Sequence, residues 1–446
     1  MHLKKILLIY LPLGTSDGEA LKRTDCNSLR SLPPLDLMYL ASIAKLCEYE
    51  AKIKDYTLGG DILRDIAEYN PDYLLANITT AGFMAEMKVL ADIKASFPNL
   101  KIIVKGAPFF AYNANVIYEN PFINYVIYSE TELTLKEILE NTSEKEILGI
   151  CYPNNFQCIK NEKRPFNESL DSLPLPAREL VDNSIYKNPY NNKTQTVINI
   201  SRGCPNYCFF CLATPLQGEK VRIRSVENVI AEIRECVDKY KITDFYFDAD
   251  IFNFDNVWLI NFCHSIIKEN LKITWMADFY PQGIDAELAK MMYKSGCRVV
   301  NLGIESASVE ILNKIGKKIS LDEVKNIIKV LKKNKILVVA SFILGFPWDT
   351  KDTIMETINF SLSANIDFAN FNSAIPLPGS KFFGYAMLKR LADNNLEFKR
   401  SFLEPIIRTH SLSKEKIADL VNLAYRKFYF RLKTIFKTFF VKYFYK

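Results

Sequence analysis

Short apolar runs alternate with longer amphipathic stretches along most of this chain, and that alternation is the strongest constraint on its fold. In residues 1–140 the apolar runs predict strands at Lys5–Tyr10, Ala51–Asp55, Tyr73–Ile78, Lys101–Lys105 and Tyr125–Ile127. The stretches between them predict helices at Leu35–Glu48, Gly60–Tyr69, Ala85–Phe97 and Thr131–Glu140. This order predicts an open, mostly parallel, Rossmann-like α/β sheet with helices on both faces. Ligands of such sheets bind at the carboxyl ends of the strands.

The alternation breaks off over residues 141–195 and then returns. The interrupting segment is rich in Asn and holds Pro153, Pro165, Pro174, Pro176 and Pro189, which predicts an extended linker. Later strands are predicted at Thr196–Ile200, Asp244–Phe247, Ile273–Met276, Val299–Gly303, Ile336–Leu344 and Phe368–Ala374. With helices such as Val226–Tyr240 between them, residues 196–385 predict a partial or full TIM-like (βα)6 barrel. Residues 386–446 are predicted to form a helical C-terminal extension.

Composition narrows the class of protein further. The 446 residues are 49% apolar and carry 57 Lys+Arg against 51 Asp+Glu, a net charge of +6. These values are typical of a soluble globular protein of two or three domains, and the charge is too small to indicate nucleic-acid binding. The apolar start of the chain is more typical of a buried strand than of a signal peptide, and no apolar window is long enough for a membrane span. Ten cysteines in such a chain indicate reduced thiols or a metal site in the cytoplasm.

Three of these cysteines form a close group directly after the first strand predicted in the second block. They occur within eight residues, Cys204-Pro-Asn-Tyr-Cys208-Phe-Phe-Cys211. Thiolates suit zinc or iron–sulfur clusters. A structural zinc site would need a fourth ligand nearby, but the next candidates, Cys236 and His264, lie well beyond the loop. Three ligands on a four-iron cluster would leave one iron open to a substrate or cofactor.

The spacing Cys-x3-Cys-x2-Cys, with an aromatic residue before the last Cys and Ser201-Arg202-Gly203 ahead of the first, resembles the signature of the radical S-adenosylmethionine (SAM) superfamily. The resemblance implies that Cys204, Cys208 and Cys211 hold a 4Fe–4S cluster. It further implies that the amino and carboxylate groups of SAM bind the open iron. One-electron reduction then cleaves SAM to methionine and a 5′-deoxyadenosyl radical, and a reductant such as flavodoxin or ferredoxin would supply the electron.

Three later segments strengthen the resemblance by their order. Asn301–Ser306 resembles the family's Gly-Ile-Glu-Ser segment, Phe342–Pro347 the segment near the adenine, and Pro376–Ser380 a Pro-x-Pro-Gly-Ser turn. The resemblance implies SAM contacts at Phe210, Asp248, Asp250, Glu305, Ser306 and Gly345. Two places depart from the family. Asp248 and Asp250 stand where many members have Gly-Gly-Glu, so either is a candidate partner for the SAM amino group or simply a solvated strand end. The segment Ala277–Tyr280 lacks the Arg often found there.

The first block resembles the cobalamin-binding domain that precedes the barrel in class B radical SAM enzymes. The matching segments are Pro33–Ala41, Asn77–Thr80, Ile103–Pro108 and Ser129–Glu132. The resemblance implies cobalamin contacts at Thr79, Thr80, Gly106, Ser129 and Glu130. Lys105 and Ser129 replace glycines that usually line this surface, and Lys105 would clash with the nucleotide tail of cobalamin or pair with its phosphate. His2 is too near the terminus to be a convincing cobalt ligand, and a scaffold domain without cofactor stays open.

The C-terminal segment Tyr425–Lys446 has seven Lys/Arg, no acidic residue and ten aromatic residues. At helical spacing one apolar, mainly aromatic stripe is formed by Tyr425, Phe428, Tyr429, Leu432, Phe436, Phe439, Phe440 and Tyr443. Docking of this stripe on the barrel is the commoner use, and contact with a membrane interface is the alternative. Nucleic acid ranks last, because no second recognition module is visible.

These features predict an enzyme, a cobalamin-dependent radical SAM methyltransferase acting on an unactivated carbon. The alternatives are a ring-forming or rearranging radical SAM enzyme, and an iron–sulfur scaffold or sensor without catalysis. The predicted substrate is a small or lipid-like molecule, and the predicted location is the cytoplasm, with possible peripheral contact to a membrane through residues 425–446. No further catalytic residue can be assigned.

Overall fold

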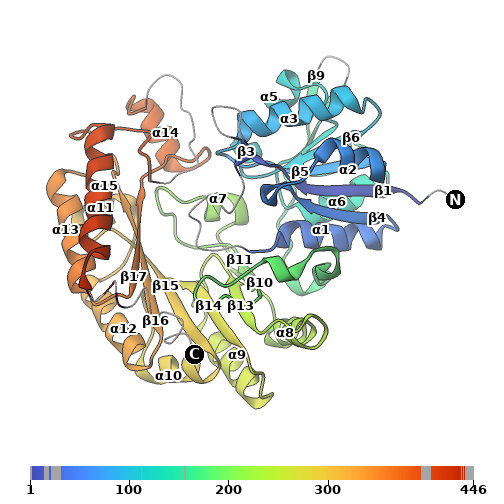
Figure 1. Ribbon diagram of the computed structural model, residues 1–446. Coiled ribbons are helices and arrows are strands. Elements are labelled where there is room, and N and C mark those ends of the chain that lie inside the picture. Colours follow the sequence, from blue (N-terminus) through green and yellow to red (C-terminus); the bar gives the residue numbers. More distant parts are fainter. Residues whose placement is uncertain are drawn as a thin grey trace. The chain divides into compact units, whose positions relative to one another are not determined.

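The computed structural model describes residues 3–14, 20–21, 32–111, 113–154, 157–392, 403–432, 434 and 436. The chain divides into two compact units, Met1–Ile185 and Tyr186–Lys446 (Figure 1). Both units are α/β, and each is built around a sheet of parallel strands connected by helices, as the alternating pattern predicts.

The sheet of the first unit has seven strands in the order β4-β1-β5-β6-β7-β8-β9. Their bounds are β1 Lys5–Tyr10, β4 Glu50–Asp55, β5 Tyr73–Asn77, β6 Lys101–Lys105, β7 Tyr125–Ile127, β8 Ile150–Asn154 and β9 Gln157–Lys160. The strands from β4 to β7 run parallel, whereas β8 and β9 are antiparallel. Two short strands, β2 Leu13–Gly14 and β3 Ala20–Leu21, pair separately.

Helices cover both faces of this sheet. Their bounds are α1 Leu35–Leu46, α2 Ile62–Tyr69, α3 Phe83–Ser96, α4 Pro108–Ala111, α5 Asn113–Glu119 and α6 Thr131–Leu139. Successive strand residues point to opposite faces. In β1, Ile6 and Leu8 therefore join a core with α1 and α6, while Leu7 and Ile9 join a core with α2 and α3.

Part of the segment predicted as a linker belongs to the first sheet. Strands β8 and β9 lie inside residues 141–195, and Ile150, Cys151 and Tyr152 are buried. The remainder carries three short 3-10 helices, Leu170–Ser172, Arg178–Leu180 and Asn183–Ile185. The prolines explain the misleading pattern, since Pro153 lies within β8 and interrupts its alternation of residue types.

The second unit has a six-stranded parallel sheet in the order β10-β13-β14-β15-β16-β17. The bounds are β10 Gln195–Asn199, β13 Asp244–Asp248, β14 Thr274–Phe279, β15 Cys297–Glu305, β16 Leu337–Leu344 and β17 Phe368–Ser373. The helices are α7 Ala213–Gln217, α8 Val226–Tyr240, α9 Asn256–Lys268, α10 Ala286–Lys294, α11 Val309–Ile315, α12 Leu321–Lys333, α13 Lys351–Ser363, α14 Lys381–Leu388 and α15 Lys414–Tyr429. A short pair, β11 Ser201–Arg202 and β12 Arg222–Ile223, lies outside this sheet. The sheet is open, with β10 and β17 at its edges, so the barrel is partial.

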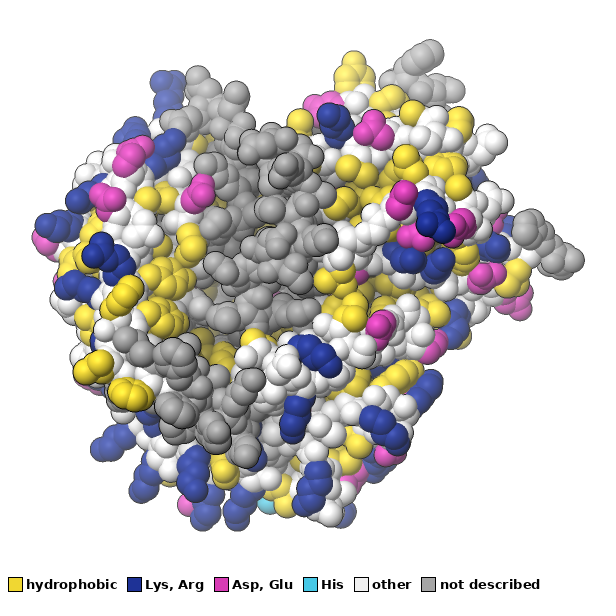
Figure 2. All heavy atoms as spheres, viewed as in Figure 1, with side chains coloured by type: hydrophobic (Ala, Val, Ile, Leu, Met, Phe, Trp, Pro, Cys, Tyr) yellow, Lys and Arg dark blue, Asp and Glu magenta, His cyan; other side chains and the backbone are white. Residues whose placement is uncertain are grey.

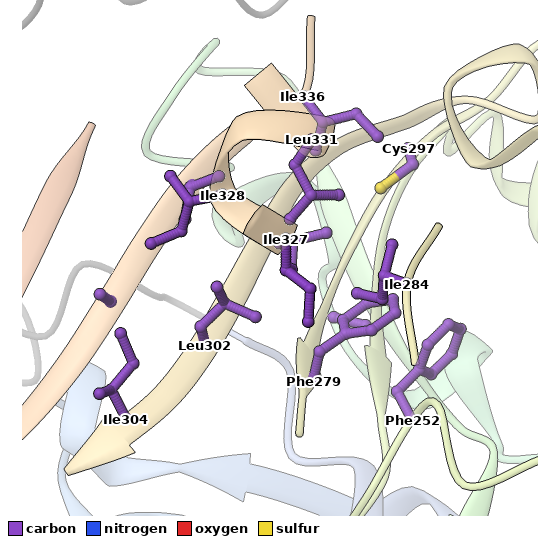
Figure 3. Packing of buried hydrophobic residues seen from close by; sticks show 14 of the residues in the cluster. Phe252, Phe279, Ile284, Cys297, Leu302, Ile304, Ile327, Ile328, Leu331 and Ile336 are labelled. Carbon is purple, nitrogen blue, oxygen red and sulfur yellow. The ribbon is translucent and has the colours of Figure 1, made fainter. Parts of the chain in front are cut away.

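The core of the second unit lies between the outer face of this sheet and the helices. Figure 3 shows Ile327, Ile328 and Leu331 of α12 beside Leu302 and Ile304 of β15. Three cysteines, Cys236 of α8, Cys263 of α9 and Cys297 of β15, are buried in the same core. Figure 2 shows Lys and Arg side chains spread over the outer surface with Asp and Glu among them, in line with the small net charge of +6.

Helix α15 covers the open edge of the sheet at β17. An edge strand leaves backbone N–H and C=O groups unpaired. The Tyr429 hydroxyl donates to the Ala369 carbonyl at 2.8 Å and accepts from its N–H at 3.2 Å, and the Tyr425 hydroxyl accepts from the Phe371 N–H at 3.1 Å. Phe428 is fully buried against Phe371. The part of the aromatic stripe that lies on α15 therefore docks on the barrel.

Beyond α15 the stripe is exposed where the structure describes it. Leu432 and Phe436 are exposed, and Phe439, Phe440 and Tyr443 lie outside the described residues. Membrane contact therefore stays a prediction. Among the described residues, none of the helices has the length and hydropathy needed to cross a bilayer.

We expect Phe428→Ala to lower the free energy of unfolding by about 3–5 kcal/mol, because it empties a fully buried aromatic site. The matched control is Phe430→Ala, two residues along, whose side chain is 78% exposed and should change stability by less than about 0.5 kcal/mol. Urea unfolding of the full chain measures both. Equal effects of the two variants would contradict the docking of α15.

Candidate functional site

Alternation along the strands of the second unit places a polar set of side chains on the inner face of the sheet. In β15, Leu302 and Ile304 belong to the outer core, so Asn301, Gly303 and Glu305 must face inward. The same reasoning puts three more polar residues inside, Asn199 of β10, Asp248 of β13 and Asp278 of β14, because their neighbours pack outward. All lie at or near the carboxyl ends of their strands, where a barrel carries its chemistry.

The cysteine loop follows the carboxyl end of β10 and is tightly held. Gly203 has φ +99°, and a Cβ there would lie 2.2 Å from the Lys220 carbonyl, so only glycine fits. The Cys204 N–H donates to the Gly218 carbonyl at 3.0 Å. The Thr214 hydroxyl lies 2.8 Å from the carbonyl of Cys204. These contacts explain how a short loop can hold several thiols in fixed positions.

The three thiols share one environment. Burial raises the pKa of Cys204 and Cys208, and raises that of Cys211 to about 11. The charge of each earlier cysteine raises the pKa of the later ones further, which places the three within electrostatic reach of one another. Among the described residues no three His, Cys, Asp or Glu side chains converge on a single metal ion. In a four-iron cluster each thiolate would bind a different iron, so the three thiols need not meet at one point.

Two carboxylates lie at the carboxyl end of β13, beside this loop: Asp248 is the last residue of the strand, and Asp250 follows it. Asp250 accepts a hydrogen bond from the Gly203 N–H at 2.7 Å, which ties it to the residue before Cys204. Asp248 accepts from the Asn199 amide at 3.0 Å. Burial, with the nearby charges of Asp250 and Asp278, raises the pKa of Asp248 to about 6. The structure thus brings both predicted carboxylates to the site.

A further carboxylate was missed by the sequence analysis. Asp278 accepts from the Tyr246 hydroxyl at 2.6 Å and from the Asn301 amide at 2.7 Å. The Oδ1 atom of Asn301 is buried and has no partner among the described residues. Asp278 occupies the segment where the family's Arg is absent, and its position on the inner face follows from the alternation of β14, which was the available signal.

Glu305 lies at the end of β15 with an unusual backbone. Its φ is +65°, in the left-handed region that non-glycine residues rarely adopt, and the register of β15 shifts just before it. Lys317, which the sequence analysis missed, places its Nζ atom 3.6 Å from Glu305 Oε1 and 4.5 Å from the centre of the Tyr280 ring. No motif marks Lys317, which follows α11 in the chain.

The remaining predicted SAM residues lie nearby but are engaged in packing. The Phe210 ring packs on Phe346, with ring centres 5.6 Å apart. Ser306 is buried, and its hydroxyl bonds to Thr357 at 3.2 Å and accepts from the Ser308 N–H at 3.1 Å. The Gly345 N–H donates to Asp349 at 2.9 Å. A role for these residues in binding SAM stays a prediction, and their observed bonds show that they also shape the turns after β15 and β16.

In the first unit the five residues predicted for cobalamin lie after β5, β6 and β7, at one edge of the sheet. Thr79 is fixed by Glu86, which accepts from its N–H at 2.7 Å and its hydroxyl at 2.8 Å, and Thr80 beside it is partly buried. A Cβ on Gly106 would lie 2.0 Å from the Ile78 carbonyl, so the glycine is required by the backbone itself. Glu130 accepts from the Asn167 N–H at 2.5 Å.

Lys105 and Ser129, the two residues that replace family glycines, have distinct surroundings. Lys105 forms an ion pair with Asp36 at 2.5 Å, and Asp36 also accepts from the Tyr10 hydroxyl. Burial raises the pKa of Asp36, but the charge and hydrogen bond of Lys105 outweigh it and lower the pKa overall. Lys105 therefore has a partner within the domain. The buried Ser129 hydroxyl has none among the described residues.

Comparisons with known proteins agree with this geometry. The sequence profile of the radical SAM superfamily matches residues 198–361. An uncharacterized methyltransferase of Pyrococcus horikoshii is 32% identical over 99% of this chain and 95% of its own length. The anaerobic magnesium-protoporphyrin IX monomethyl ester cyclase of Rubrivivax gelatinosus is 25% identical over 89% of this chain and 74% of its own length.

Among solved structures, the cobalamin-dependent SAM radical enzyme OxsB, with aqua-cobalamin and SAM bound, matches with a TM-score of 0.75. The match covers 95% of this chain and 66% of OxsB at 15% identity, so it shows a shared fold across both units. The predicted fold class is thereby confirmed.

We expect Asp248→Asn to stabilise the ligand-free protein at pH 8 by about 1–2 kcal/mol, allowing for partial exposure. The folded-state pKa is about 6 and the ordinary value 3.8, so the folded protein binds the proton more tightly. Wild-type stability must then fall as the pH rises through this window. The advantage of the variant should shrink at pH 5, which urea unfolding at both pH values measures. Asp322→Asn, at a side chain that is 94% exposed, is the control; an advantage of Asp248→Asn that does not change with pH would contradict the assignment.

Proposed function

The chain belongs to the radical SAM superfamily, and we propose that within it this enzyme is a cobalamin-dependent methyltransferase acting on an unactivated carbon. Membership rests on the relative that is 32% identical over 99% of the chain. The observation that carries the proposal is the loop of three thiols at the carboxyl end of β10, next to Asp248, Asp250 and Glu305.

Cys204, Cys208 and Cys211 would hold the 4Fe–4S cluster. Once bound, the cluster supplies the electron that cleaves SAM to methionine and a 5′-deoxyadenosyl radical. The chain's part is to fix the thiols through Gly203 and Thr214 and to limit the access of water, since Cys204 is only 7% exposed. Exclusion of water protects a reactive intermediate from side reactions.

Asp248 and Asp250 would receive the SAM amino group. An amino group bound to the open iron keeps N–H donors, and carboxylates in a partly buried site accept hydrogen bonds from them; both carboxylates lie beside the cysteine loop. Asp278 and Asn301 present further acceptors on the same inner face and suit hydroxyl groups of SAM or substrate. Phe210, Glu305, Ser306 and Gly345 would complete the surroundings, with Ser306 and Gly345 acting through the turns that they hold.

Thr79, Thr80, Gly106, Ser129 and Glu130 would line a cobalamin site at the edge of the first sheet. Cobalamin, once bound, carries the methyl group. The unpartnered hydroxyl of Ser129 fits a site that awaits a polar ligand. Because Lys105 is paired with Asp36, it need not clash with a bound ligand, and its charge is already balanced.

The substrate is proposed to be a small molecule, and a flavodoxin or ferredoxin the reductant. A lipid-like substrate and peripheral membrane contact through residues 425–446 remain predictions, as does the cytoplasmic location. Ring formation without methyl transfer is the second candidate, because the relative from Rubrivivax gelatinosus that aligns over 89% of this chain is a cyclase.

We expect alanine replacement of any one of Cys204, Cys208 and Cys211 to abolish 5′-deoxyadenosine formation and to deplete bound iron, because a three-thiolate site loses a ligand. Iron analysis after anaerobic reconstitution and product analysis with dithionite measure both. Cys47→Ser, at a partly buried cysteine of the first unit, is the control and should keep both. SAM cleavage that persists in the variants of Cys204, Cys208 or Cys211 would contradict the assignment as a radical SAM enzyme.

We expect reconstitution with hydroxocobalamin to give about one cobalamin per chain, as a single site in the first unit requires. The triple variant of Cys204, Cys208 and Cys211 is the control and should bind as much cobalamin, because its changes lie in the other unit. With SAM and dithionite, methyl transfer should produce S-adenosylhomocysteine besides 5′-deoxyadenosine. A ring-forming enzyme would yield 5′-deoxyadenosine alone, and a chain without cobalamin would contradict the methyltransferase assignment.

A further inference from the structure

Lys317 is a buried cation close to the cysteine loop. Its side chain is 8% exposed, and its only ion pair among the described residues is with Glu305, 3.6 Å away. Lysine is seldom buried, because taking its charge out of water is costly, and a buried ion pair often contributes less to stability than apolar residues of similar volume. Stability alone is thus a weak reason for this pair.

The backbone around Gly303 and Glu305 leaves room for the side chains of this ion pair. A Cβ on Gly303 would lie 2.7 Å from Glu305 Oε1 and 3.4 Å from Lys317 Nζ, so the absent side chain leaves the room that both groups occupy. Glu305 reaches the position only through its left-handed backbone, with φ +65°. Strain of this kind costs energy and concentrates at functional sites.

The position of Lys317 relative to the thiols is fixed by hydrogen bonds. The Phe209 N–H, within the cysteine loop, donates to the Ile315 carbonyl at 2.9 Å, two residues before Lys317. The Tyr280 hydroxyl donates to the Lys318 carbonyl at 3.0 Å, and its ring lies 4.5 Å from Lys317 Nζ. The side chains of Tyr280 and Cys204 pack in one buried cluster, so the ring beside Lys317 belongs to the immediate surroundings of the first thiol.

We propose that Lys317 is a charge-compensating residue that raises the reduction potential of the cluster held by Cys204, Cys208 and Cys211, and that Glu305 limits the size of this effect. The inference rests on the proposed cluster. Reduction adds one electron from an external low-potential donor, breaks no bond and moves no proton, so the site becomes more negative. A fixed ammonium group stabilises that reduced form, and a nearby carboxylate destabilises it.

The test is a redox titration of the reconstituted full-length protein without SAM, followed by the electron paramagnetic resonance signal of the reduced cluster. Lys317→Met should lower the equilibrium constant for reduction at least about tenfold, equal to a potential about 59 mV lower for one electron. Glu305→Gln should shift the potential in the opposite direction. Lys317→Arg keeps the charge and should stay within about threefold of wild type.

Lys318→Met is the matched control, because it removes the same charge from the exposed neighbouring residue. A merely structural role for Lys317 would change how much cluster is bound but not the midpoint of the bound fraction. Equal midpoints for Lys317→Met and Lys318→Met would overturn the inference. If the Lys317→Met variant binds no cluster, the Glu305→Gln variant tests the inference instead. A reduction potential of Glu305→Gln that equals the wild-type value or lies below it would overturn the inference. Wild-type protein without any cluster would instead overturn the proposed function, as iron analysis shows directly.

Discussion

The two-residue period of the parallel strands is the constraint on which the rest of the second unit depends. Burial of Leu302 and Ile304 against α12 fixes the register of β15, because a shift of one residue would exchange its two faces. Glu305 is then forced to the inner face. The same burial in β13 and β14 leaves Asp248 and Asp278 inside. The apolar core thus determines where the polar site lies.

This arrangement gathers acidic groups and thiols in one partly buried place, which has an electrostatic cost. Burial raises the pKa of Asp248 and Glu305, and each carboxylate disfavours ionisation of its neighbours. Burial raises the pKa of Asp250 as well, and cations offset part of the cost: the charges of Arg202 and Arg222 partly counteract the rise at Asp250, and that of Lys317 the rise at Glu305. Among the described residues, acceptors for hydrogen bonds therefore outnumber the cations beside them in this part of the sheet.

Sequence patterns predict most of the strands but only part of the site, for physical reasons. Strands such as Lys5–Tyr10 and helices such as Val226–Tyr240 have the predicted bounds, because their apolar residues recur at the period of the element. Strands β8 and β9 were missed, because Pro153 and polar residues hide their alternation. Lys317 was missed, since its approach to Glu305 depends on a strained backbone and on the space above Gly303, which no local pattern encodes.

Lys105 and Ser129, which replace family glycines in the first unit, show how the surrounding residues can accommodate a departure from a family pattern. Lys105 would be an unpaired charge at the end of β6, but Asp36 at the start of α1 and Tyr10 at the end of β1 form a network with it. Because β1 and α1 are held in place by their own buried residues, Asp36 meets Lys105 without rearrangement. Ser129 differs, since its buried hydroxyl lacks a partner among the described residues. An unsatisfied buried hydroxyl is costly in a finished protein, so Ser129, unlike Lys105, is a departure that the described part of the domain does not absorb.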